Sequence, residues 1–167
     1  RYGNVMASRG SVIPTFVDQL ISGKDITITD PNMTRFLMSL DEALELVIYG
    51  FKQNVNGSIF IKKSPSAKII TLYEALKDIF QIRGNKIKII GTRHGEKKHE
   101  TLLSAEEKAL STEKKNYYTI KYDNRDLNYE KFFSKGTKIL SQSDEYKSNS
   151  YTTLKTNQII KLIKSTS

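Results

Sequence analysis

The chain has 167 residues, of which 38% are hydrophobic and none is cysteine, and its formal net charge is +9. The missing cysteine excludes disulfides and thiolate metal sites, and no apolar run approaches the ~18 residues that suggest a membrane span. The charge indicates an anionic partner or, equally, a lysine-rich composition. No basic stripe with interleaved aromatic residues is present, so we expect neither nucleic acid nor a membrane as partner.

The first part of the chain is predicted to alternate strands and helices. Residues 1–7 (RYGNVMA) alternate like a strand already under way, so we interpret the chain as part of a longer protein. Residues 12–21 form an amphipathic helix that ends before Gly23. Residues 25–29 (DITIT) and 34–40 (TRFLMSL) are predicted to be short strands.

The middle of the chain continues this alternation. Apolar residues recur at the helical period over residues 41–51, and GSIFIKK at 57–63 is a strand that follows a glycine turn. A second helix runs from a Thr71 cap to Ile82, and KIKII at 86–90 is the next strand. The apolar residues of that helix that we expect to be buried are Leu72, Leu76, Ile79 and Phe80.

The last part of the chain has a weaker pattern. Ser104 and Glu107 have the spacing of a capping box that opens a short helix. NYYTIKY at 116–122 is a candidate strand, and residues 154–163 are a candidate terminal helix. The segment between them is predicted to be an irregular arm held by aromatic residues, namely Tyr129, Phe132 and Phe133. The alternation predicts the α/β class, with short strands that add to a larger sheet.

The stretch TRHGEKKHETL combines two histidines with several charged residues. A zinc pair on a helix requires histidines at i and i+4. His94 and His99 do not have that spacing, and the HExxH order is absent. We therefore predict no metal site here.

An anion site explains the same stretch better than a metal site does. Arg93 follows the strand predicted at 86–90, and Gly95 is predicted to turn the chain into a helix. Ligands of α/β proteins gather at the carboxyl ends of strands, an arginine can fork onto a phosphate, and helix N-terminal N–H groups attract anions. Glu96 can accept hydrogen bonds from a ribose diol. The alternative is a surface arginine beside a helix-start glutamate, and the local pattern leaves both open.

A second candidate site is SRGSVIPTF, which follows the first predicted strand. Ser8, Gly10 and Ser11 offer N–H and hydroxyl donors in a loop that could hold a polar ligand. An ordinary turn between a strand and a helix explains the same pattern.

A third candidate is Arg35, which lies between Thr34 and Phe36 in a mostly apolar run. A cation in such a setting usually has an anionic partner. Either Asp30 or Asp41, or a ligand phosphate, could fill that role. We find no Ser–His–acid set, no paired carboxylates in an apolar setting and no GxGxxG motif, so we predict no catalytic residue in this chain.

Four segments together resemble the C-terminal half of the extended short-chain dehydrogenase/reductases. They are RYGNVMASRGSVIPTF, ITITDPNMTRFLMSLDEALELV, GSIFIKKSPSAKI and IIGTRHGEKKHETLLSAEE. The most similar group is the polysaccharide-biosynthesis enzymes that act on nucleotide sugars. NRDLNYEKFF and EYKSNSYTTL resemble the C-terminal extension of the capsule and O-antigen branch. The resemblance implies a substrate-binding portion over residues 1–122 and a C-terminal extension over residues 123–167.

The resemblance also implies the ligands and the residues that would contact them. The substrate would be a UDP-sugar, and NADP would be bound mainly by an N-terminal Rossmann half, with Val5 of this chain against the nicotinamide. The implied substrate contacts are Asn4, Arg9, Ser11 and Val12 in the sugar-nucleotide pocket, Thr27, Ile28 and Thr29 beside the uracil, Arg35 and Arg93 at the diphosphate, and Glu96 at the uridine ribose.

The activity that the resemblance implies is 4,6-dehydration of UDP-N-acetylglucosamine with inversion at C5, in bacterial surface polysaccharide biosynthesis. It also implies a cytoplasmic homo-oligomer. A 4-epimerase of the same fold and a non-catalytic anion-binding module are the alternatives. Lys98 and His99 depart from the apolar and aromatic residues usual in the family, and this departure puts the local packing in doubt more than ligand binding.

Overall fold

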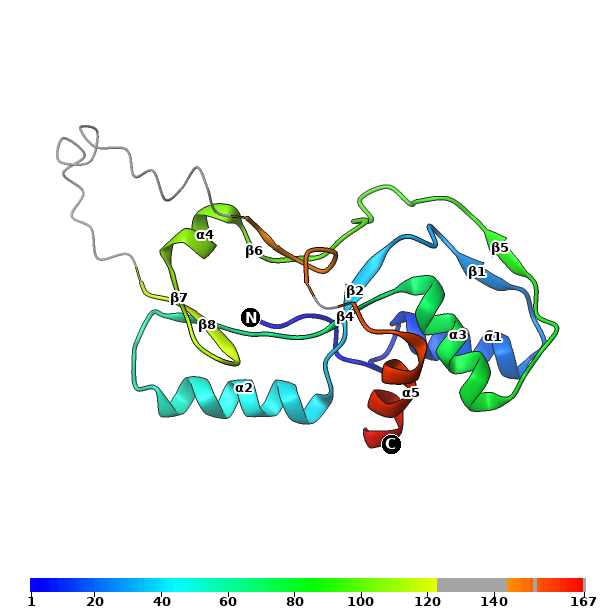
Figure 1. Ribbon diagram of the computed structural model, residues 1–167, viewed down its shortest axis with the longest axis horizontal. Helices are drawn as coiled ribbons and strands as arrows, with labels where there is room; N and C mark the ends of the chain where they lie inside the picture. The colour runs from blue at the N-terminus through cyan, green and yellow to red at the C-terminus, as the bar shows by residue number, and fades with distance from the viewer. Residues whose placement is uncertain (123–143, 152, 167) are drawn as a thin grey trace.

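The computed structural model describes residues 1–122, 144–151 and 153–166. It confirms the expected α/β class, with short strands and helices arranged in an elongated molecule. One end of the molecule gathers helices α1, α3 and α5, and the other carries α2, α4 and a small antiparallel sheet (Figure 1). The predicted arm with Tyr129, Phe132 and Phe133 lies outside the described residues. No helix within the described ranges is long and apolar enough to cross a bilayer.

The helical end is built on three amphipathic helices. They are α1 (Val12–Ile21), α3 (Ile69–Phe80) and α5 (Thr156–Ser165). Beside them, strand β1 (Ile26–Ile28) pairs in parallel with β5 (Ile87–Ile89). The fully buried side chains of this core include Phe16, Leu20, Ile26, Leu72, Leu76 and Ile159. The helix predicted at 12–21 and the strands predicted at 25–29 and 86–90 are confirmed.

The other end is a three-stranded antiparallel sheet in the order β3 (Ile59–Lys62), β8 (Tyr117–Ile120) and β7 (Ser111–Glu113). Helix α2 (Leu40–Lys52) packs against β3. A second core lies here, formed by Phe36, Ile61, Leu102, Leu103, Tyr118 and Tyr146. The strands predicted at 57–63 and 116–122 are confirmed, with shorter bounds.

Two antiparallel pairs lie between these ends. Strand β2 (Thr34–Phe36) pairs with β4 (Ser66–Lys68), and β6 (Thr101–Leu103) pairs with β9 (Tyr146–Lys147) from the C-terminal part of the chain. Helix α4 (Ala105–Leu110) follows β6, and its first turn has the predicted capping box, in which the side chains of Ser104 and Glu107 each accept a backbone N–H bond. The described residues after position 143 therefore pair with β6 through β9 and with β4 through the bridge of Thr153 to Ser66.

Several predicted elements differ from the structure. The strand predicted at 34–40 is limited to β2, because Ser39 caps α2 and Leu40 already belongs to that helix. Residues 1–7 are not a strand, because their only strand-type pairing in the described part of the chain is the isolated bridge of Val5 to Met38. Instead they pass closely over β2: a Cβ added at Gly3 would lie 2.5 Å from Phe36 Cβ, so only glycine fits there. Thr71 was expected to cap the helix α3, but α3 begins at Ile69 with Lys68 as its N-cap, so Thr71 lies within the helix. The last helix begins at Thr156 instead of 154.

The buried faces of two helices also differ from expectation. Phe80, the last residue of α3, is 39% exposed, because the buried residues of this helix end at Leu76 and its last turn extends past the core. On α2 only Ala43 and Leu46 are buried. Its remaining apolar side chains are exposed: Leu40, Leu44, Val47, Ile48 and Phe51. We call this set the apolar face of α2.

Candidate functional site

A cavity of about 320 Å³ lies between the start of α1, strand β1, strand β2 and the loop after β5. This volume is within the range of small-ligand sites. Every contact residue that the family resemblance implies, except Arg9, lines it: Asn4, Val5, Ser11, Val12, Thr27, Ile28, Thr29, Arg35, Arg93 and Glu96. Of the second candidate loop, Gly10 and Ser11 line the cavity and Ser8 does not. Arg9 lies exposed in the turn before α1 and does not reach the cavity wall. The fold thus brings together segments that are far apart in the sequence.

The N-terminus of α1 forms one wall of this cavity. Ser11 is the N-cap residue, but its side chain makes no capping bond. Its buried Oγ has no hydrogen-bond partner among the described residues. A buried hydroxyl normally has a partner, so Ser11 Oγ is suited to bind a polar group of a ligand.

Several lining residues were not predicted from the sequence. They are Met6, Ile13, Thr15, Phe16, Met33, Leu37, Ile69 and Ile90, whereas Gly10 belongs to the loop already proposed as a second candidate site. Most are apolar and also belong to the hydrophobic core, so nothing in the sequence distinguishes them as cavity residues. Thr15 could have been predicted from the helical period, because it lies one turn after Ser11 on the same face of α1.

Arg35 enters the cavity from β2 with its guanidinium held by main-chain and side-chain groups. Its Nη1 donates to the carbonyl oxygen of Thr34 at 2.8 Å and to that of Lys98 at 3.2 Å. Two carboxylates lie farther away, with Glu96 Oε1 at 3.8 Å from Nη2 and Glu100 Oε1 at 3.7 Å from Nε. These are ion pairs without hydrogen-bond geometry. Neither Asp30 nor Asp41, the acids expected from the sequence, is the partner of Arg35 in the described structure.

Arg93 and Glu96 belong to one tight turn after β5. The Glu96 N–H donates to the Arg93 carbonyl oxygen at 3.1 Å, and the Arg93 N–H donates to Glu96 Oε2 at 3.2 Å. Gly95 has a φ of +78°, a conformation that glycine adopts without a steric penalty. The turn does not open a helix, so the expected contribution of helix N-terminal N–H groups at this point is wrong. Local side-chain and main-chain bonds stabilise the loop instead.

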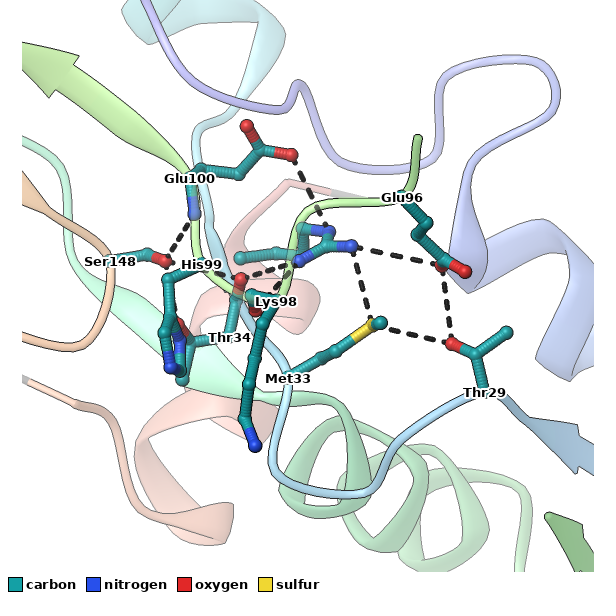
Figure 2. A network of polar contacts seen from close by, with 9 residues as sticks. Thr29, Met33, Thr34, Glu96, Lys98, His99, Glu100 and Ser148 are labelled. Carbon is teal, nitrogen blue, oxygen red and sulfur yellow. Dashed lines mark hydrogen bonds and ion pairs between the residues drawn. The ribbon is translucent and has the colours of Figure 1, made fainter. Parts of the chain in front are cut away.

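Thr29 connects this turn to the end of β1. Its Oγ1 donates to Glu96 Oε1 at 3.2 Å, as Figure 2 shows. Glu96 therefore contacts a threonine, an arginine and a backbone N–H at once. A carboxylate held in this way keeps a fixed direction toward the cavity.

Lys98 and His99 have structural contacts beside the cavity. Lys98 Nζ lies 3.1 Å from Asp30 Oδ2, and His99 Nδ1 lies 2.8 Å from Thr34 Oγ1. Burial lowers the pKa of His99, and the positive charges of Lys98 and Arg35 lower it further. The described ranges contain no cluster of histidine and acidic side chains that could hold a metal ion.

The arrangement is suited to an anionic ligand that carries hydroxyl groups. Two guanidinium groups line the cavity, and no side-chain ion pair of Arg93 is found in the described part of the chain. Guanidinium groups bind phosphate oxygens in pairs of parallel bonds. The carboxylate of Glu96 can accept from hydroxyl groups nearby. The cavity contains no nucleophile beside a base in the described residues.

The sequence models of two related families cover the whole chain. The family described as "Polysaccharide biosynthesis protein" matches residues 1–122, and the one described as "Polysaccharide biosynthesis protein C-terminal" matches residues 123–167.

Individual proteins agree with these matches. The chain is 49% identical over 163 residues to a UDP-glucose 4-epimerase of Rickettsia massiliae, and 50% identical to one of Rickettsia canadensis. Each alignment covers 98% of this chain and 48% of the relative, so the chain spans about half the length of the curated relatives it matches. Among solved structures, Pen from Bacillus thuringiensis superposes with a TM-score of 0.81 at 30% identity, over 99% of this chain and 48% of Pen.

Proposed function

Because the chain belongs to the polysaccharide biosynthesis protein family, we propose that it binds the UDP part of a nucleotide sugar, as the substrate-binding portion of a longer nucleotide-sugar-modifying enzyme. The observation that supports this most directly is the cavity where Arg35, Arg93 and Glu96 meet. Arg35 comes from β2, whereas Arg93 and Glu96 share the turn after β5, so no single local motif requires the three to converge. Two cations and one acceptor fit a diphosphate and a ribose diol.

The remaining lining residues are assigned in the same proposal. Thr27, Ile28 and Thr29 at the end of β1 lie beside the uracil, and Ser11 and Asn4 bind the sugar. Asn4 is exposed and not buried as its place in an apolar run would suggest, so its amide is open to a ligand. Arg9 is not part of the pocket in this conformation.

NADP is the cofactor that the family resemblance implies, and we propose that Val5 contacts it. Val5 lines the cavity and is held in place by its bridge to Met38. An apolar side chain at the cavity edge fits the flat face of a nicotinamide. When bound, the cofactor would supply hydride transfer, while this chain would bind and orient the sugar nucleotide.

Two reactions are candidates for the longer enzyme. The Rickettsia relatives carry the name UDP-glucose 4-epimerase, which favours 4-epimerisation. The sequence resemblance favours 4,6-dehydration of UDP-N-acetylglucosamine with inversion at C5. Mass spectrometry of the product separates them, because dehydration removes one water from the sugar and epimerisation leaves its mass unchanged.

The apolar face of α2 also supports a longer enzyme. Phe51 is 83% exposed and Leu40 is 64% exposed. A contiguous apolar surface of this kind usually marks an interface. Arg1 and Tyr2 line a hollow next to it, together with Val47 and Phe51. We propose that an N-terminal half, joined at Arg1, covers this face.

The test of the proposed function is a calorimetric titration of the 167-residue chain with UDP. We expect UDP-selective binding that Arg93→Ala abolishes and that Lys114→Ala leaves unchanged, since Lys114 contacts Tyr49 on α2, away from the cavity. A non-catalytic anion-binding module would instead tolerate Arg93→Lys and lose affinity steeply with added salt. That second pattern would contradict the proposal.

A further inference from the structure

Ser148, in the C-terminal extension, is fully buried beside the cavity although it does not line it. It follows β9, and its backbone N–H donates to the Glu100 carbonyl oxygen at 2.9 Å. Its Oγ accepts from the Glu100 N–H at 2.9 Å and lies 2.6 Å from Thr34 Oγ1. The same Oγ donates to the Thr34 carbonyl oxygen at 3.1 Å. One hydroxyl therefore joins β2 to the segment after the Arg93 turn, as Figure 2 shows.

The groups that Ser148 holds are those that direct Arg35. The Thr34 carbonyl oxygen accepts from both Ser148 Oγ and Arg35 Nη1. Glu100, whose N–H donates to Ser148, places its carboxylate 3.7 Å from Arg35 Nε. The Thr34 N–H in turn donates to the Lys98 carbonyl oxygen, which is the second acceptor of Arg35 Nη1. The direction of the guanidinium thus depends on two segments that Ser148 keeps in register.

We propose that Ser148 is a positioning residue for the ligand's diphosphate, acting through Arg35, and this inference rests on the function proposed above. Its side chain is outside the cavity wall, so it does not touch the ligand. Loss of the hydroxyl would leave the Glu100 N–H and the Thr34 hydroxyl without this partner in a buried place. Buried groups without partners are costly, so the segments would move apart or admit water. The C-terminal extension is then part of the machinery that shapes the substrate site.

The test compares Ser148→Ala with a matched control in the same segment, Ser150→Ala, whose side chain is exposed. UDP affinity of the 167-residue chain is measured by calorimetry, and thermal unfolding is recorded beside it. We expect Ser148→Ala to weaken UDP binding roughly fivefold to tenfold, which is less than the loss of a whole charge-assisted bond, because Arg35 would stay in place but be less well directed. Ser150→Ala should stay within about twofold of the unsubstituted chain.

A double-mutant cycle separates positioning from general destabilisation. In an Arg35→Lys background, which lacks the guanidinium fork, Ser148→Ala should change UDP affinity by less than about twofold, because the two residues act through one contact. An equal loss in both backgrounds, or unchanged affinity with a lower melting temperature, would overturn the proposal. If Ser148→Ala does not fold, Thr34→Val removes the other hydroxyl of the same contact and carries the same expectation. Because Thr34 Oγ1 also contacts His99 Nδ1, His99→Phe is its control and should leave UDP affinity within about twofold.

The two proposals fail in different ways. If the unsubstituted chain does not bind UDP, the proposed function is wrong and this inference falls with it. If the chain binds UDP and Ser148→Ala binds it equally well, only the positioning role is wrong.

Discussion

Arg35 Nη2 lies 3.8 Å from Glu96 Oε1 across the cavity, although Arg35 belongs to β2 and Glu96 to the turn after β5. The pair is too far apart for a strong hydrogen bond. The guanidinium therefore keeps donors that a phosphate can take. Glu96 accepts one bond on each oxygen, from Thr29 and from the Arg93 N–H, and a carboxylate has further acceptor sites for a ligand hydroxyl. The same separation that makes this a weak internal ion pair makes it a suitable ligand site.

The first prediction concerns the charge of Arg35. Arg35→Ala should weaken UDP binding about tenfold to a hundredfold, because each lost charge-assisted bond to phosphate is worth ~1.5–3 kcal/mol. Arg35→Lys should recover only part of that loss, since an ammonium cannot fork onto two oxygens. Calorimetric titration with UDP gives the measurement. Arg83→Ala serves as control because Arg83 is exposed and does not line the cavity. An equal loss in that control would show that net charge alone attracts UDP.

The second prediction concerns the unpartnered hydroxyl of Ser11. Ser11→Ala should weaken the binding of a UDP-sugar by about fivefold and leave UDP itself nearly unchanged, because we assign Ser11 Oγ to the sugar. Comparing the two ligands on one variant cancels any general effect on the fold. If both affinities fall together, Ser11 supports the N-terminus of α1 and not the sugar. Thr15→Ala tests whether the next turn of the helix contributes to the same face.

The third prediction is a pH dependence of stability that comes from His99. Its pKa in the folded chain is below the ordinary value of 6.5, first because of burial and then because of Lys98, Arg35 and Lys147, with Asp30 acting in the opposite direction. The unfolded chain then binds more protons between the two values, so stability is lost as the pH falls below about 6.5. The melting temperature should drop between pH 7.5 and pH 5.5.

The control for this pH dependence is a pair of histidine variants. His99→Gln should have a smaller drop in melting temperature over that range than the unsubstituted chain. His94→Gln should keep the full drop, because His94 lies exposed on the same loop. If the melting temperature of His99→Gln falls as far as that of the unsubstituted chain, the pH dependence comes from aspartate and glutamate side chains and not from His99.

The sequence predicted the parts of the fold whose signal is local. The period of α1 and the capping box of Ser104 and Glu107 need only neighbouring residues, and both are present. The strand expected at residues 1–7 did not form. A strand requires a neighbouring strand to pair with, and alternation in the sequence does not show whether one is present. The turn at Gly95 was foreseen, but the helix after it was not formed: Arg93 and Glu96 bond to each other and close the loop.

The site was harder to predict than the fold, because its residues converge only in three dimensions. Arg35 in the sequence looked like a cation that needs an acid, but its acids, Glu96 and Glu100, lie in another segment. The contribution of Ser148 could not be read from the chain, since a lone serine in a polar stretch carries no pattern. Its burial and its bonds to Thr34 and Glu100 distinguish it.

The last prediction concerns the apolar face of α2. If an N-terminal half covers it in a longer protein, the 167-residue chain alone should self-associate through it, because burying a large apolar side chain is worth ~1.5–3 kcal/mol. Leu44→Lys combined with Phe51→Lys, both at exposed positions, should shift the chain toward a monomer in analytical ultracentrifugation.

In the longer protein the same double variant should lower the melting temperature, because two charges would be buried at the interface between its halves. Lys161→Glu, a charge change at an exposed position of α5, which packs against α3, is the matched control and should affect neither measurement. A longer protein that tolerates both lysines on α2 without loss of stability would show that this face stays open to solvent, and its exposed apolar side chains would then need a different partner to explain them.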